Sequence, residues 1–292
     1  MRSPALCAAA VVQTVVTGLA PGDARAHEFW LSPSTYRPGR ADTIALRAFV
    51  GSGFRGELKP YATTRTVRFT MQGAKRIDLI QAVTNGELRW AVFIAPDDGG
   101  QLLAYESNFA FIELPAERFD RYLATEGLDA TRAARAQLGA QAGPGRERYA
   151  RCAKTWIAGR DPKRAHVPQG LSLEIVPLAD PEGGPRLPIQ VFYRGKPLPD
   201  ALVRTWNRAL ERGTIPFDAA GRDSVAPVQE LRTAPDGGAT LDVRHSGEWL
   251  INAVHMVPSE DRQQADWQSL WASFTFARPP VAGERSRRAR RR

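Results

Sequence analysis

Short runs of β-branched, aliphatic and aromatic residues, separated by turn residues, dominate the chain from Glu28 to Ala110. The runs are bounded by Pro-Gly, Asn-Gly and Asp-Gly-Gly sequences, a pattern that predicts β-strands joined by turns. Regular spacing of this kind is typical of a β-sandwich. We expect strands over the segments 43–50, 66–70, 87–94 and 101–106.

The period of the apolar pattern changes at Pro115. Phe119, Tyr122 and Leu123 follow at spacings of three and four residues, which places them on one face of a helix. Proline suits the first turn of a helix, and Gly127 is placed to end it.

A second helix is predicted next, with Asp129 as its cap, Leu138 near its end and Gly139 as its stop. The two helices form a hairpin inserted between strands over about 115–139. After it, the second half of the segment 146–156 favours a strand, although its residues also suit a helix.

The second half of the chain is again rich in strand-forming residues. Its turns are built around Gly-x-Pro-Leu and Asp-Gly-Gly sequences, which suit a small immunoglobulin-like or transthyretin-like sandwich. The fold class we expect is therefore mainly β, with one sandwich over 27–168 and another over 169–278. The strands predicted in the second sandwich are 171–176, 188–193, 201–206, 240–243, 249–256 and 273–276.

The first 26 residues have the features of an export signal. A positive charge at Arg2 precedes an apolar stretch, and Ala24-Arg25-Ala26 fits a small-x-small cleavage site. Cleavage there predicts a periplasmic protein whose mature chain begins at His27.

An N-terminal histidine is an unusual ligand, because its free α-amine and its ring Nδ1 can chelate one metal ion from a single residue. Copper(II) and nickel(II) accept nitrogen ligands in square or tetragonal geometry, so they are the cofactors we expect. The alternative is that His27 merely follows the cut and binds nothing.

The other histidines differ in their surroundings. His166 lies in a basic loop and His245 next to a Ser-Gly turn, and we expect both to be solvated. Strand alternation places His255 on the face shared by Ile251 and Ala253, where a histidine is either a satisfied core residue or a third nitrogen ligand.

Carboxylates and the cysteine add little to the site. Glu106, in a predicted strand, is a candidate oxygen ligand. Cys152 is the only cysteine after the signal, so no internal disulfide is expected and a buried structural thiol is the simplest role. No helical His-Glu-x-x-His, Gly-x-Ser-x-Gly or phosphate-binding glycine loop is found, and no catalytic residue is predicted.

The formal net charge of +9 is concentrated at the C-terminus, where six arginines lie within the last eight residues. The body of the protein is only mildly basic, so we expect no nucleic-acid partner. The segment 279–292 follows a Pro/Gly-rich exit and predicts a disordered tail that either touches anionic envelope surfaces or only adds solubility.

Eight segments spread over nearly the whole mature chain share a family pattern: 26–31, 53–57, 119–128, 148–154, 173–177, 194–198, 254–256 and 266–276. Together they resemble a family of exported bacterial proteins of unknown function that carries the label of a nickel-uptake substrate-specific component. The resemblance implies a periplasmic metal-binding protein linked to nickel or cobalt uptake.

The expected function is therefore periplasmic metal binding, with nickel or copper held by His27, His255 and Glu106 and delivered to a membrane transporter. Two other functions remain open. One is a copper-dependent oxidative enzyme that uses an N-terminal histidine, and the other is a metal-free binding or scaffold module of the cell envelope.

Overall fold

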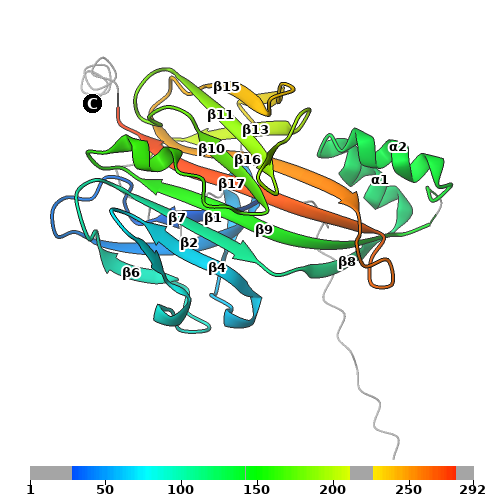
Figure 1. Cartoon of the computed structure of the whole chain (residues 1–292), viewed down its shortest axis with the longest axis horizontal. Coiled ribbons are helices and arrows are strands. Elements are labelled where there is room, and N and C mark those ends of the chain that lie inside the picture. The colour runs from blue at the N-terminus through cyan, green and yellow to red at the C-terminus, as the bar shows by residue number, and fades with distance from the viewer. Residues whose placement is uncertain (1–27, 142, 211–225, 281–292) are drawn as a thin grey trace, which may run out of the picture.

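The computed structural model describes residues 28–141, 143–210 and 226–280. This part of the chain is mainly β, as predicted, and its strands form three sheets that stack as sandwich layers (Figure 1). None of its helices is long and apolar enough to cross a membrane. The signal segment, His27 and most of the arginine-rich tail lie outside the described residues.

Nine strands form a central sheet, whose longest members are β9 (Gly145–Ile157), β16 (Gly247–Pro258) and β17 (Trp267–Arg278). β17 pairs antiparallel with β16 and parallel with β9. Strands covered on both faces lose the alternation of polar and apolar residues, and β17 is buried over nearly its whole length. The other strands of this sheet are β4 (Thr66–Gln72), β5 (Arg76–Asp78), β7 (Gln101–Ser107), β8 (Ala110–Leu114), β13 (Leu202–Arg208) and β14 (Gln229–Arg232).

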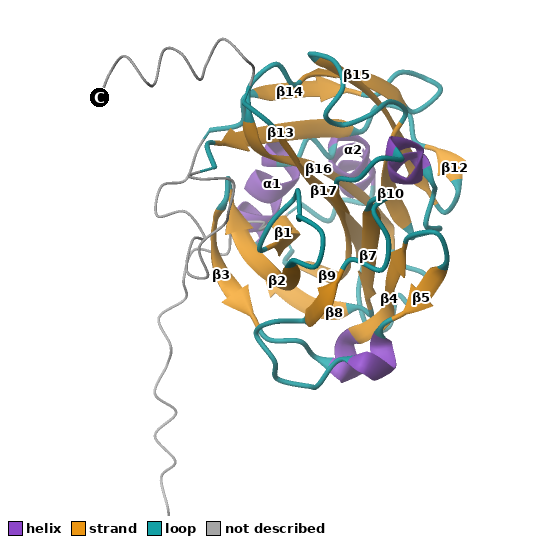
Figure 2. Ribbon diagram, turned by 90° about the vertical axis from the view of Figure 1, so that its left-hand side faces the viewer, coloured by secondary structure: helices purple, strands orange, loops and turns teal. Residues whose placement is uncertain are grey.

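A four-stranded sheet covers each face of the central sheet. Figure 2 shows β2 and β3 on one side of β9 and β17, and β10 and β12 on the other. The first outer sheet contains β1 (Glu28–Pro33), β2 (Thr43–Ser52), β3 (Arg55–Lys59) and β6 (Ala91–Ile94). The second contains β10 (Leu173–Pro177), β11 (Arg186–Tyr193), β12 (Lys196–Pro197) and β15 (Gly238–Asp242).

The predicted helical hairpin is present as α1 (Ala116–Thr125) and α2 (Asp129–Gln137). Gly127 and Gly139 follow the two helices with positive φ angles of 62° and 64°, which confirms both predicted stops. The predicted cap is wrong. Leu128 occupies the cap position without a side-chain hydrogen bond, while the Asp129 carboxylate pairs with Arg232 at 2.6 Å.

The apolar face of α1 packs on the same face of the central sheet as β1 does. Phe119, Tyr122 and Leu123 are buried, as the spacing predicts, in a cluster with side chains of β16 and β17. The helices therefore shield the part of the face that the first outer sheet leaves open. Three short 3-10 helices complete the described structure: η1 (Thr63–Arg65), η2 (Ile80–Ala82) and η3 (Pro162–His166).

Most predicted strands are found, and their boundaries differ for local reasons. β6 begins at Ala91 rather than at residue 87. Before that point the backbone makes loop hydrogen bonds, in which the Glu87 carbonyl accepts from the Tyr61 N–H and the Trp90 N–H donates to the Leu46 carbonyl. β17 begins six residues before its predicted start at 273, because its polar residues hide the strand signal. Gln268, for example, is buried and accepts a hydrogen bond from Arg148 of β9.

The central sheet joins the two halves of the sequence. The parallel pairing of β17 with β9 runs from Trp267 opposite Glu147 to Thr275 opposite Thr155, so strands from both sides of residue 168 share one ladder. The division into domains at that residue stays a prediction.

Candidate functional site

Three carboxylates are buried together on the helix side of the central sheet. Glu28 begins β1, Glu126 directly follows α1 and Glu147 lies in β9, and their exposed fractions are only 4%, 5% and 3%. Buried carboxylates are rare unless they are paired, so a group of this kind marks a candidate site. We refer to Glu28, Glu126 and Glu147 as the carboxylate cluster.

Glu147 is held by two hydroxyl groups. The Tyr122 hydroxyl donates a hydrogen bond of 3.0 Å to its Oε1, and the Ser269 hydroxyl donates to the same oxygen. Trp271 supports both donors, because its Nε1 donates to Ser269 Oγ at 3.1 Å and its ring stacks on Tyr122. Burial nevertheless dominates and raises the pKa of Glu147 to about 7.

Glu28 is less well satisfied. Burial raises its pKa to about 7, and the charge of Glu126 adds to the rise, against hydrogen bonds from its own backbone and Ser52. Its Oε2 atom is buried without a hydrogen-bond partner among the described residues. An acceptor oxygen in this state is costly, and a cation beside it would relieve the cost.

Two arginines approach the cluster from the central sheet. Arg204 donates to Glu126 at 2.7 Å and to Glu230 at 2.9 Å. Arg151 lies against the rings of Tyr149 and Trp271, and burial lowers its pKa. The cluster thus combines two carboxylates, Glu28 and Glu147, whose pKa burial raises to about 7, with the nearby positive charges of two arginines, and it can hold a proton.

The structure places His255 on the other face of the central sheet. Its neighbours Val254 and Met256 pack under the helices, whereas the His255 ring contacts Tyr193 of β11, with the ring centres 4.5 Å apart. The ring is half-buried, as alternation predicts, and burial lowers its pKa to about 4. His255 is therefore neutral at ordinary pH, which is the form that binds metals.

Glu106 lies on the same face as His255 but does not meet it. Its carboxylate accepts a hydrogen bond from the Ser172 hydroxyl and lies 3.9 Å from Arg68. Three strand spacings separate β7 from β16, or about 14 Å, so the two side chains do not share one metal ion. The third predicted ligand, His27, lies outside the described residues.

The predictions for the other two described histidines and for the cysteine have different outcomes. His245 is exposed, as expected. His166 is not fully solvated, because η3 packs its ring partly into the protein and buries its Nε2 atom. Cys152 is buried, as expected, and burial raises the pKa of its thiol far above the usual range.

Among the described residues, no group of three or more histidine, cysteine, aspartate or glutamate side chains has the arrangement of a metal site. Glu28 is the described carboxylate that follows the predicted N-terminal ligand in the chain.

A model of a domain of unknown function, DUF4198, matches residues 24–257. The chain belongs to the DUF4198 family. No curated protein matches this DUF4198 chain. Among solved structures, the D0-D1 domain of intimin aligns with it at 13% identity and a TM-score of 0.19, covering 86% of this chain and 97% of that one. That TM-score is too low for the alignment to bear on fold or function.

The sequence did not single out most of the carboxylate cluster. Glu28 is visible as an acidic residue in an apolar segment, but Glu126 and Glu147 lie in polar surroundings that look like ordinary surface. Their burial results from packing between α1, β1 and β9, which are far apart in the chain. For a buried acceptor near α1 the sequence offers one signal, Tyr122. Its hydroxyl lies on an apolar helix face and needs a buried hydrogen-bond partner.

Proposed function

We propose that this DUF4198 protein is an exported metal-binding protein that holds nickel(II) or copper(II) at the start of its mature chain and supplies it to metal uptake. His27 would contribute its α-amine and ring nitrogen after cleavage at Ala24-Arg25-Ala26. Nitrogen donors of this kind suit the tetragonal geometry of both ions.

The observation that carries the proposal is the state of Glu28. Its carboxylate is buried, its Oε2 has no described hydrogen-bond partner, and its pKa lies at about 7. A metal ion bound to His27 would bring positive charge next to the Glu28 Oε2 atom, which has no described hydrogen-bond partner. We therefore propose Glu28, in place of His255 and Glu106, as the partner of His27, since His255 contacts β11 on the opposite face.

The bound ion would be transported by the protein as cargo. It would be held by the two neutral nitrogens of His27 and by the Glu28 carboxylate. Binding would release the proton that Glu28 keeps up to about pH 7, so affinity should rise with pH through that value. Delivery would then be favoured wherever local acidity returns the proton.

The test is calorimetric titration of nickel(II) and copper(II) into protein purified from the periplasm, with the N-terminus verified by intact mass. We expect one ion per chain. One extra alanine before His27 converts the amine to an amide, and Glu28→Gln removes the charged oxygen. Each change should lower the metal affinity by at least about tenfold. This is the lower end of the loss in affinity that follows when residues supporting a metal site are mutated.

Glu113→Gln is the matched control, because Glu113 is an exposed carboxylate of β8 and undergoes the same chemical change. It should leave the affinity unchanged. Unaltered binding after the N-terminal extension would refute the role of His27, and unaltered binding in Glu28→Gln would refute the role of the carboxylate. A loss in His255→Ala equal to that in Glu28→Gln would restore the ligand set expected from the sequence.

A further inference from the structure

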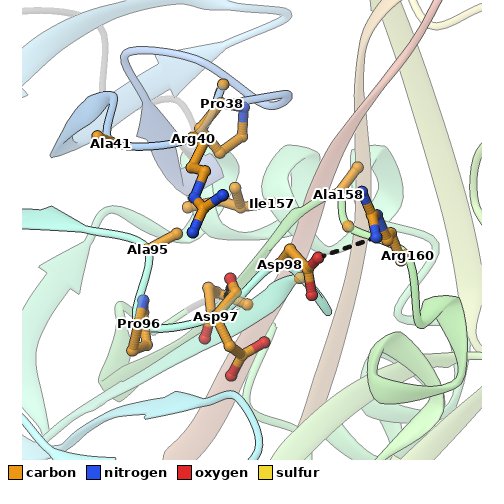
Figure 3. Close-up of a pocket in the computed structure, with 14 residues that line it drawn as sticks. Pro38, Arg40, Ala41, Ala95, Pro96, Asp97, Asp98, Ile157, Ala158 and Arg160 are labelled. Carbon is orange, nitrogen blue, oxygen red and sulfur yellow. Dashed lines mark hydrogen bonds and ion pairs between the residues drawn. The ribbon is translucent and has the colours of Figure 1, made fainter.

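A pocket lies away from the carboxylate cluster, at the end of the sheets where β9 finishes. The loop after β1, the connection from β6 to β7 and the turn after β9 enclose a pocket of about 740 Å³ (Figure 3). Pockets of this volume accommodate molecules of small-ligand size. The contributing segments are 38–41, 95–98, 100–101 and 157–160.

Closely packed backbone forms one wall of the pocket. Gly100 has a φ of +91° and lies against the Trp156 ring, and a Cβ atom on Gly159 would come within 2.0 Å of the Gly100 nitrogen. Gly99 lies in the same way against the guanidinium of Arg164. Because no side chain fits between these segments, the wall is preformed and binding needs little reordering.

Most of the charge around the pocket is already neutralised. Asp97 is paired with Arg164 and accepts a hydrogen bond of 2.7 Å from the Gly99 N–H. Asp98 and Arg160 form a looser pair at 3.3 Å, with side-chain exposures of 74% and 86%. An exposed pair of this kind can open to accept and donate hydrogen bonds at little cost.

Arg40 is different, because it makes no ion pair or hydrogen bond with another described residue. Figure 3 shows its side chain projecting into the space between Ala95, Ile157 and Asp97. A guanidinium offers donors in a fork that matches a carboxylate in two parallel hydrogen bonds. It is thus the one described cation of the pocket that lacks a counter-charge.

We propose that this pocket binds a small polyhydroxylated carboxylate, such as a sugar acid. The carboxylate pairs with Arg40, and neighbouring hydroxyl groups, which both donate and accept, bind Asp98 and Arg160. A phosphate ester fits less well, because its second negative charge meets no further unpaired cation: Arg160 is already compensated by Asp98. A flat aromatic ligand also fits less well, because none of the described residues that line the pocket is aromatic.

The experiment is calorimetric or NMR titration of the mature protein with glucuronate, glucose and glucose 6-phosphate. We expect glucuronate to bind and the other two to bind at least about tenfold more weakly. Glucose lacks the charge-assisted bidentate contact with Arg40, and the second negative charge of glucose 6-phosphate meets no unpaired cation in the pocket. Arg40→Gln should reduce glucuronate affinity about tenfold or more, and Asp98→Asn should reduce it by a smaller factor.

Arg55→Gln is the matched control, because Arg55 is exposed on β3, its side chain makes no ion pair or hydrogen bond with a described residue, and it lies at the other end of β2. It should leave binding unchanged, and melting temperatures should show that all variants fold. Absence of glucuronate binding at about 10 mM ligand overturns the proposal. Equal binding of glucose, stronger binding of the phosphate ester or equal effects of Arg40→Gln and Arg55→Gln overturn it as well. None of these outcomes depends on metal binding at His27.

Discussion

The two faces of the central sheet bury carboxylates in opposite ways. On the face covered by β10, Glu174 is only 3% exposed and accepts hydrogen bonds from Lys154 Nζ at 2.7 Å and from the backbone N–H groups of Gln169, Gly170 and Leu171. On the helix face, Glu147 is buried equally but accepts bonds from two hydroxyl groups at one oxygen.

The comparison shows that the supply of donors, more than depth of burial, decides what a buried carboxylate does. One cation and three oriented N–H groups complement the negative charge of Glu174, so it serves as a fixed ionic connection between β9 and the loop before β10. Glu28 and Glu147 lack that complement, and burial raises the pKa of each to about 7. A structural ion pair and a proton-binding cluster thus share one sheet.

The largest effect should come from breaking the structural pair. Lys154→Met leaves Glu174 charged and buried without its cation, which typically costs about 3–5 kcal/mol. We expect urea denaturation at pH 7 to show a loss of that size. Adding Glu174→Gln to Lys154→Met should recover much of it, because the unpaired charge is then gone. A double variant no more stable than Lys154→Met would mean that packing of the lysine stem, rather than charge, dominates.

A smaller effect, with a defined pH dependence, should follow from Glu147→Gln. The folded protein keeps the Glu147 proton up to about pH 7, whereas the unfolded carboxyl loses it near 4.5, so folding binds a proton between these values. The free energy of unfolding therefore falls as the pH rises through this window, by up to about 3 kcal/mol for one such group.

Glu147→Gln should remove this part of the slope, and denaturation curves at several pH values from 4.5 to 8 measure it. Glu113→Gln, which alters an exposed carboxylate, should keep the wild-type slope. If Glu147→Gln also kept that slope, the helix-face cluster would not differ from the Glu174 site in the way proposed.

The smallest effect should come from removing one donor. Tyr122→Phe deletes the 3.0 Å hydrogen bond to Glu147 while keeping the ring on Trp271. Hydrogen bonds to charged acceptors contribute about 1.5–3 kcal/mol, so we expect a loss near the lower figure at pH 8. The loss should be smaller at pH 5, where Glu147 is neutral, and an equal loss at both pH values would contradict the charge-dependent role of the tyrosine.

The sequence by itself determined the class of fold and much of its order. Apolar periodicity located most of the strands, the helical hairpin and its buried face at Phe119, Tyr122 and Leu123. Gly127 and Gly139 marked the ends of the helices, because only a residue without a side chain adopts their φ values readily. These features depend on residues that lie close together in the sequence, so one amino-acid sequence is enough to predict them.

The tertiary structure alone decided the sites. It placed His255 and Glu106 three strands apart on one face and gathered Glu28, Glu126 and Glu147 on the other, although no local pattern links these residues. It likewise brought Arg40 to the end of β9 and left it without a described counter-charge. Burial and pairing of charges depend on contacts between segments far apart in the chain, and those contacts exist only once the layers have stacked.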